Sequence, residues 1–111
     1  MTSAARAIEN YEKLSTLTRE LREAAVRGEW DRLTDIQQER TDIAKAMAAV
    51  DSTTSLGESA LRRKDELIEH ILADEAETRE RVKTRMAQMA SELQEGRQEL
   101  RLLREYRRHA G

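Results

Sequence analysis

The sequence predicts an all-α fold, an antiparallel helical bundle of three main helices, the third one long, followed by a short C-terminal helix. Charged residues make up 38% of the 111 residues and hydrophobic residues another 38%, whereas aromatic residues are only 3% and proline is absent. Residues that favour helices therefore dominate, and the aromatic residues that favour strands are scarce. A chain of this length forms one small domain, residues 1–111, with a thin core.

The charges of the chain nearly balance, with 20 lysines and arginines against 22 aspartates and glutamates. Such a chain has no strong overall field to attract nucleic acid or an anionic membrane. It has no cysteine, and therefore neither disulfides nor a thiolate metal site. No apolar run has the length of a signal peptide core or of a membrane span. We expect a cytoplasmic protein that does not insert into membranes.

The first predicted helix begins at Thr2 or Ser3, because either hydroxyl can cap a helix N-terminus. Apolar and small residues then recur at intervals of three and four, which is the spacing of one helix face. These residues are Ile8, Tyr11, Leu14, Leu17 or Thr18, Leu21, and Ala24 or Ala25.

A turn is predicted directly after this helix. Gly28 stands where a left-handed C-terminal cap is expected, and it also reverses the chain. Glu29 and Asp31 place negative charge in the first turn of the next helix, where the helix dipole favours it. Trp30, the only tryptophan, is expected to pack the turn against the core rather than to contact a partner. We therefore assign Gly28 and Trp30 a structural role.

The second predicted helix carries a row with the same alternating spacing. Its members are Trp30, Leu33, Ile36 or Gln37, Arg40, Ile43 or Ala44, Met47 and Val50. A polar, turn-rich segment, Asp51 to Gly57, follows and is predicted to be a loop whose hydroxyls cap the next helix.

The third predicted helix begins near Ser59 and is longer than the other two. Its apolar positions keep a heptad-like phase and comprise Leu61, Ile68, Ile71 or Leu72, Val82, Met86, Met89 and Leu93. Gly96 interrupts it within a polar run, and we expect a hinge there, although one glycine costs only about 1 kcal/mol relative to alanine. Beyond Gly96 the segment can either extend the third helix or fold back as a short fourth one.

The unequal lengths of these helices suggest where a partner binds. At about 1.5 Å per residue, a third helix of roughly 37 residues reaches about 55 Å, against about 35 and 30 Å for the first two. The far end of the third helix then lies beyond the hairpin of the first two, and it holds Val82, Met86, Met89 and Leu93. This row is either core or an exposed interaction site, which adaptable methionines suit. Its cover is the segment after Gly96, a second copy of the chain, or a client.

The C-terminal segment is basic. Five arginines, Arg97, Arg101, Arg104, Arg107 and Arg108, outweigh Glu99 and Glu105, so the segment carries 5 − 2 = +3 and the rest of the chain −2 − 3 = −5. This asymmetry can direct the segment onto an acidic partner or onto the body of the protein, but a solvated face is the commoner explanation. No helix-turn-helix signature accompanies it, so the sequence does not predict direct DNA binding.

No cofactor or metal is expected, and no catalytic role. His70 has Glu66 and Asp74 one helical turn away on either side, but no second histidine lies nearby and the Glu-x-x-His pattern of di-iron bundles is missing. His109 lies close to the C-terminus. The sequence contains no nucleophile paired with a base and no phosphate-binding glycine loop, so we expect a protein that is not an enzyme.

The run from Leu21 to Leu33, LREAAVRGEWDRL, resembles the turn between the first two helices of the FliT-type flagellar export chaperones. The order of elements, with a long third helix and a short C-terminal one, extends the resemblance over nearly the whole chain. It implies a cytosolic chaperone that binds the C-terminal segment of the filament-cap protein FliD and keeps it monomeric until type III export. It also implies contacts with components of the export ATPase complex.

In some members of that family the same protein binds the master transcription regulator FlhDC and lowers its activity, and the last helix covers the client site. Carried over to this chain, the client-binding groove comprises Val82, Met86, Met89 and Leu93. Residues 1–96 form the hairpin and the long third helix, and 97–111 form the regulatory helix. Its covering residues are Leu100, Leu103, Tyr106, Arg97, Arg101, Arg104 and Arg108. The alternatives are a modulator of FlhDC acting by protein contact and a self-associating helical adaptor that forms a homodimer.

Overall fold

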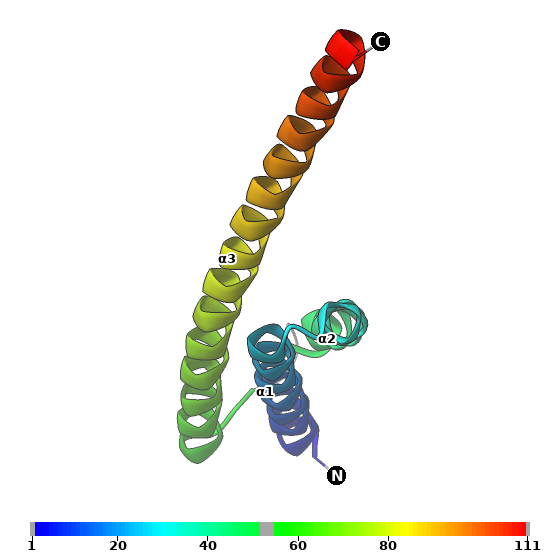
Figure 1. The fold of residues 1–111 in the computed structure, drawn as a ribbon. Helices are drawn as coiled ribbons and strands as arrows, with labels where there is room; N and C mark the ends of the chain where they lie inside the picture. The colour runs from blue at the N-terminus through cyan, green and yellow to red at the C-terminus, as the bar shows by residue number, and fades with distance from the viewer. Residues whose placement is uncertain (1, 52–54, 111) are drawn as a thin grey trace. The chain divides into compact units, whose positions relative to one another are not determined.

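The computed structural model describes residues 2–51 and 55–110 and contains three helices (Figure 1). They are α1 (Ser3–Arg27), α2 (Trp30–Asp51) and α3 (Glu58–Ala110), and no strand occurs among the described residues. The predicted all-α class is confirmed. The predicted loop, Asp51 to Gly57, falls partly on residues 52–54, which lie outside the described residues. Of the rest, Asp51 ends α2, and residues 55–57 are not helical.

Helix α1 begins after Thr2, one of the two predicted caps. The Thr2 hydroxyl oxygen accepts a hydrogen bond from the backbone N–H of Ala5 at 3.0 Å, which satisfies one of the free donors of the first turn.

Gly28 forms the turn between α1 and α2 in the left-handed conformation, with φ of 73° and ψ of 23°. The N–H of Glu29 donates to the carbonyl of Ala24 at 2.9 Å, and that of Gly28 donates to the carbonyl of Ala25 at 3.3 Å. These two bonds make a Schellman motif, which satisfies the last carbonyls of α1. Because only two residues separate the helices, α2 must return along α1.

Replacing Gly28 with alanine is expected to lower the free energy of unfolding by about 1–2 kcal/mol, because a Cβ is strained at a positive φ. The measurement is urea denaturation monitored by circular dichroism. Gly96→Ala is the matched control, since Gly96 lies inside a helix and an added Cβ meets nothing within 4 Å. This control is expected to raise the free energy of unfolding, by at most about 1 kcal/mol. Equal effects at the two glycines would contradict the assignment of the turn.

The chain divides into two compact units, Met1–Arg79 and Glu80–Gly111. In the first unit, one core cluster joins all three helices through Tyr11, Met47 and Leu67. A second cluster, nearer the Gly28 turn, joins α1 and α2 through Leu21, Ala24 and Ile36. Early α1 residues pack against late α2 residues and late α1 residues against early α2 residues. Helices α1 and α2 are therefore antiparallel.

Ion pairs attach α3 to the other two helices within the first unit. Arg22 of α1 donates to Asp74 at 3.0 Å, and Arg40 of α2 pairs with the neighbouring Glu75. The side chain of Arg40 is only 16% exposed. This explains why an arginine occupies the predicted apolar row of α2: its stem lies in that row and its guanidinium reaches a carboxylate of α3.

The second unit is a single stretch of α3. The helix continues through Gly96 to Ala110, so of the two alternatives for the C-terminal segment the structure has the extended one. Helix α3 is 53 residues long, against 25 for α1 and 22 for α2. The prediction of one long helix and two shorter ones is confirmed, and α3 is longer than the sequence indicated. Among residues 2–51 and 55–110, no helix combines the length and the apolar character that crossing a membrane requires.

Candidate functional site

The predicted groove residues lie on one face of α3 in the second unit, because their spacing of four, three and four residues keeps them aligned. Val82 is half-buried. Met86 is 65% exposed, Met89 47% and Leu93 62%. Earlier on the same helix, Leu67 and Ile71 are buried in the core of the first unit. The apolar face of α3 therefore passes from buried to exposed, as the unequal helix lengths predicted.

Exposed apolar residues continue along this face of α3 beyond Gly96. Leu100 and Leu103 keep the same spacing and are both more than half exposed. We use the term exposed row for Val82, Met86, Met89, Leu93, Leu100 and Leu103. All of these side chains except Val82 are exposed, and a row of large exposed apolar side chains is typical of an interaction site.

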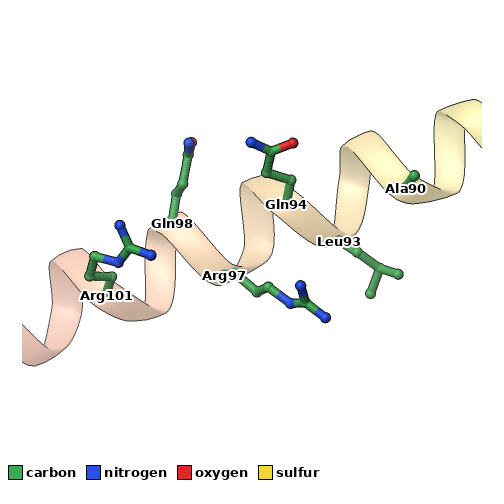
Figure 2. Close-up of a pocket in the computed structure, with 6 residues that line it drawn as sticks. All are labelled: Ala90, Leu93, Gln94, Arg97, Gln98 and Arg101. Carbon is green, nitrogen blue, oxygen red and sulfur yellow. The ribbon is translucent and has the colours of Figure 1, made fainter.

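A shallow depression lies beside the exposed row and shares one residue with it, Leu93 (Figure 2). All the residues that line it belong to α3, so it is a hollow on the surface of one helix: Ala90, Leu93, Gln94, Arg97, Gln98 and Arg101. Figure 2 shows Leu93 and Arg97 on one side of the helix and Gln94 and Gln98 on the other. An apolar side chain thus has a guanidinium as its neighbour one turn later, a combination that suits a partner with an apolar face bordered by carboxylates.

The predicted cover belongs to the same straight run of helix as the groove and does not lie over it. Leu100, Leu103 and Tyr106 are 56%, 64% and 74% exposed. Arg97, Arg101, Arg104 and Arg108 are exposed as well, and no ion pair holds them in the described part of the chain. The regulatory cover stays a prediction about a second conformation.

Among the exposed apolar residues that sequence reasoning missed is Leu102, which is 65% exposed. It does not belong to the exposed row, because it lies one position before Leu103 and so faces a different side of the helix. The signal was present in the sequence as a leucine outside the heptad-like phase.

The two residues of the predicted structural turn, Gly28 and Trp30, lie close to each other. Trp30 is half-buried, and its indole Nε1 lies 3.8 Å from the place where a Cβ on Gly28 would stand. The tryptophan thus lies against the glycine that reverses the chain. The structural role of both residues stays a prediction.

The carboxylates beside His70 have other partners. Glu66 pairs with Arg63 at 3.3 Å, and Asp74 pairs with Arg22 at 3.0 Å. Within residues 2–51 and 55–110, no three histidine, cysteine, aspartate or glutamate side chains come together as metal ligands would.

Comparison with protein-family models matches residues 8–108 to the family described as flagellar protein FliT. The chain belongs to the FliT family. The match includes both the Gly28 turn and the exposed row, and it confirms the resemblance seen between Leu21 and Leu33. The FliT family is one of chaperones in flagellar biogenesis and is not an enzyme family. Searches of curated protein sequences and of solved structures returned no match.

Proposed function

We propose that this member of the FliT family is a cytoplasmic chaperone of type III flagellar export that binds the filament-cap protein FliD and prevents its premature assembly. The observation that supports this proposal is the exposed row on α3, in a chain that matches the family model over residues 8–108. The client is the C-terminal segment of FliD, bound as an amphipathic helix along the groove part of the row, Val82, Met86, Met89 and Leu93.

Binding is driven by burial of the row. Complete burial of one leucine or methionine side chain contributes about 1.5–3 kcal/mol, so a few of these residues are enough to offset the cost of association. Methionines at two central positions let the surface adapt to a client side chain of irregular shape. The mechanism is occlusion: the client's assembly surface stays covered until it reaches the export apparatus, and no covalent chemistry takes part.

The basic segment 97–108 supplies the electrostatic part of the proposal. It carries a formal charge of +3 within a chain of net charge −2. The segment attracts acidic surfaces, which include those of the client, of export ATPase complex components or of FlhDC. Proteins, rather than DNA, are the partners of this segment, since its arginines form no recognition motif for base edges.

The test is isothermal titration calorimetry, in which a peptide of the FliD C-terminal segment is titrated into the full chain. We expect saturable binding, and none with a scrambled peptide of the same composition. Deleting residues 97–111 is expected to raise the affinity, because in the covered conformation this segment lies over Val82, Met86, Met89 and Leu93 and competes with the client for these four residues. If the deletion leaves the affinity unchanged, the regulatory cover is contradicted. If neither the full chain nor the shortened chain binds the peptide, the assignment of FliD as client is contradicted.

A further inference from the structure

Most arginines of the C-terminal segment lie on one face of α3. Four of them are spaced by four, three and four residues, which aligns side chains along a helix. We use the term arginine stripe for these four residues, Arg97, Arg101, Arg104 and Arg108. Arg97 and Arg101 line the same depression on the helix surface. All four side chains are exposed, and in the part of the chain that the structure describes none of them forms an ion pair.

The carboxylates of the same stretch lie mainly on the other side of the helix. Residues two positions apart project in nearly opposite directions, because one turn holds 3.6 residues. Glu95 and Glu99 each lie two positions from Arg97. Glu105 is the exception, since it lies one turn from Arg101. This part of α3 therefore has a strongly basic face and a separate acidic face.

Exposed leucines border the arginine stripe. Leu93 lies four positions before Arg97, and Leu100 lies three positions after Arg97 and four before Arg104. The two leucines are 62% and 56% exposed. A helix that lies in the interface of a membrane combines such apolar side chains, placed at the boundary of headgroups and acyl chains, with basic ones. Clusters of four or more basic residues on a helix of this kind bind anionic lipid headgroups.

The leucines favour a lipid surface over nucleic acid, the other common polyanion. Guanidinium groups can contact the phosphates of either. A bilayer also offers hydrocarbon in which Leu93 and Leu100 are removed from water, whereas a phosphodiester backbone offers no such surface. Only the lipid surface therefore uses both the charges and the apolar side chains of this face.

We propose that the arginine stripe binds the surface of a membrane that contains anionic lipids. The helix lies along the surface and does not cross the bilayer, with its guanidinium groups on headgroup phosphates and its acidic face toward water. The net charge of −2 does not prevent this contact, because charges farther away than about 10 Å are largely screened at ordinary ionic strength. The inference goes beyond the proposed function, which gives this segment protein partners, and does not depend on it, because lipid binding is measured with the protein alone.

Cosedimentation of the full chain with vesicles tests the proposal. We expect binding to vesicles of equal parts phosphatidylglycerol and phosphatidylcholine, and none to vesicles of phosphatidylcholine alone. The double variant Arg97→Gln with Arg104→Gln is expected to bind the anionic vesicles about ten- to thirtyfold more weakly, because it loses two of the four charges at the surface.

The matched control is Arg6→Gln with Arg19→Gln, which removes the same charge at two exposed arginines of the first unit. Its affinity is expected to stay within about threefold of the wild type, since these charges lie outside the contact. Equal losses in the two double variants, or equal binding to the two kinds of vesicle, would overturn the proposal.

Leucine variants test which face of the helix meets the membrane. Leu100→Ser removes an apolar side chain beside the arginine stripe, and Leu102→Ser removes one from the other side of the helix, where the leucine is 65% exposed. We expect Leu100→Ser to weaken binding to the anionic vesicles about tenfold and Leu102→Ser to have little effect. Circular dichroism verifies that both variants keep their helix content. Equal weakening by the two substitutions would contradict the proposal.

Duplex DNA at the same ionic strength distinguishes the two polyanions. The wild-type protein is expected to show no retardation of DNA in a gel at concentrations that saturate the anionic vesicles. DNA binding that is lost in the Arg97→Gln, Arg104→Gln variant would assign the arginine stripe to nucleic acid and refute the lipid surface as its partner.

Discussion

Replacing Leu21 with alanine is expected to lower the free energy of unfolding by about 2–5 kcal/mol. Leu21 is 3% exposed and packs against Ala24 and Ile36 where α1 and α2 meet near the turn. The substitution removes buried apolar surface and leaves a cavity between two helices. A domain with so few buried residues has little other packing to compensate, so a loss of this size is a large share of its total stability.

Urea denaturation of the full chain, followed by circular dichroism, measures the effect. The matched control is Leu102→Ala, the same chemical change at a side chain that is 65% exposed and lies outside the exposed row. The control is expected to change the free energy of unfolding by no more than about 0.5 kcal/mol. Similar losses in the two variants would show that the core is not where the structure places it.

Replacing Leu93 with aspartate is expected to weaken binding of any partner that covers the exposed row by at least about a hundredfold. Leu93 lies at the centre of the row and is 62% exposed in the chain by itself. The substitution removes an apolar contact that contributes about 1.5–3 kcal/mol, and it forces a carboxylate into an apolar interface, which costs several kcal/mol more unless the carboxylate is paired. A factor of one hundred corresponds to only about 2.8 kcal/mol.

Two measurements check this prediction, calorimetry with the FliD peptide and sedimentation of the protein alone. Leu102→Asp is the control, since it introduces the same charge at an exposed leucine outside the row. Neither substitution is expected to alter the free energy of unfolding of the first unit, because neither residue belongs to its core clusters. If Leu102→Asp weakens binding as much as Leu93→Asp does, the partner surface is not the exposed row.

Much of the fold follows from local chemistry that is visible in the sequence. The helices are evident from apolar spacing, and the Gly28 turn is evident because a left-handed cap is the commonest use of a glycine between two helical runs. The sequence also placed Val82, Met86, Met89 and Leu93 on one face of the third helix, but it left open whether they are core or an exposed interaction site. What these features have in common is that their causes act over a few residues or along one helix.

Two features needed tertiary structure. Arg40 looked like a member of an apolar row, and only the position of Glu75 on α3 explains its burial. Asp74 looked like a neighbour of His70, but in the fold it pairs with Arg22 of α1. Both contacts join residues distant in the sequence, and helical periodicity says nothing about which charged residue of one helix meets which residue of another.

The sequence by itself therefore determined three helices, their relative lengths, the turn at Gly28 and the apolar row on the last helix. Tertiary structure decided which part of α3 is core and which part is exposed, and it decided that the chain continues as helix through Gly96. The physical reason is one of magnitude. A glycine in a helix costs only about 1 kcal/mol, which burial of a single leucine can outweigh, so the path beyond Gly96 depends on which surfaces are available to pack against and not on the glycine itself.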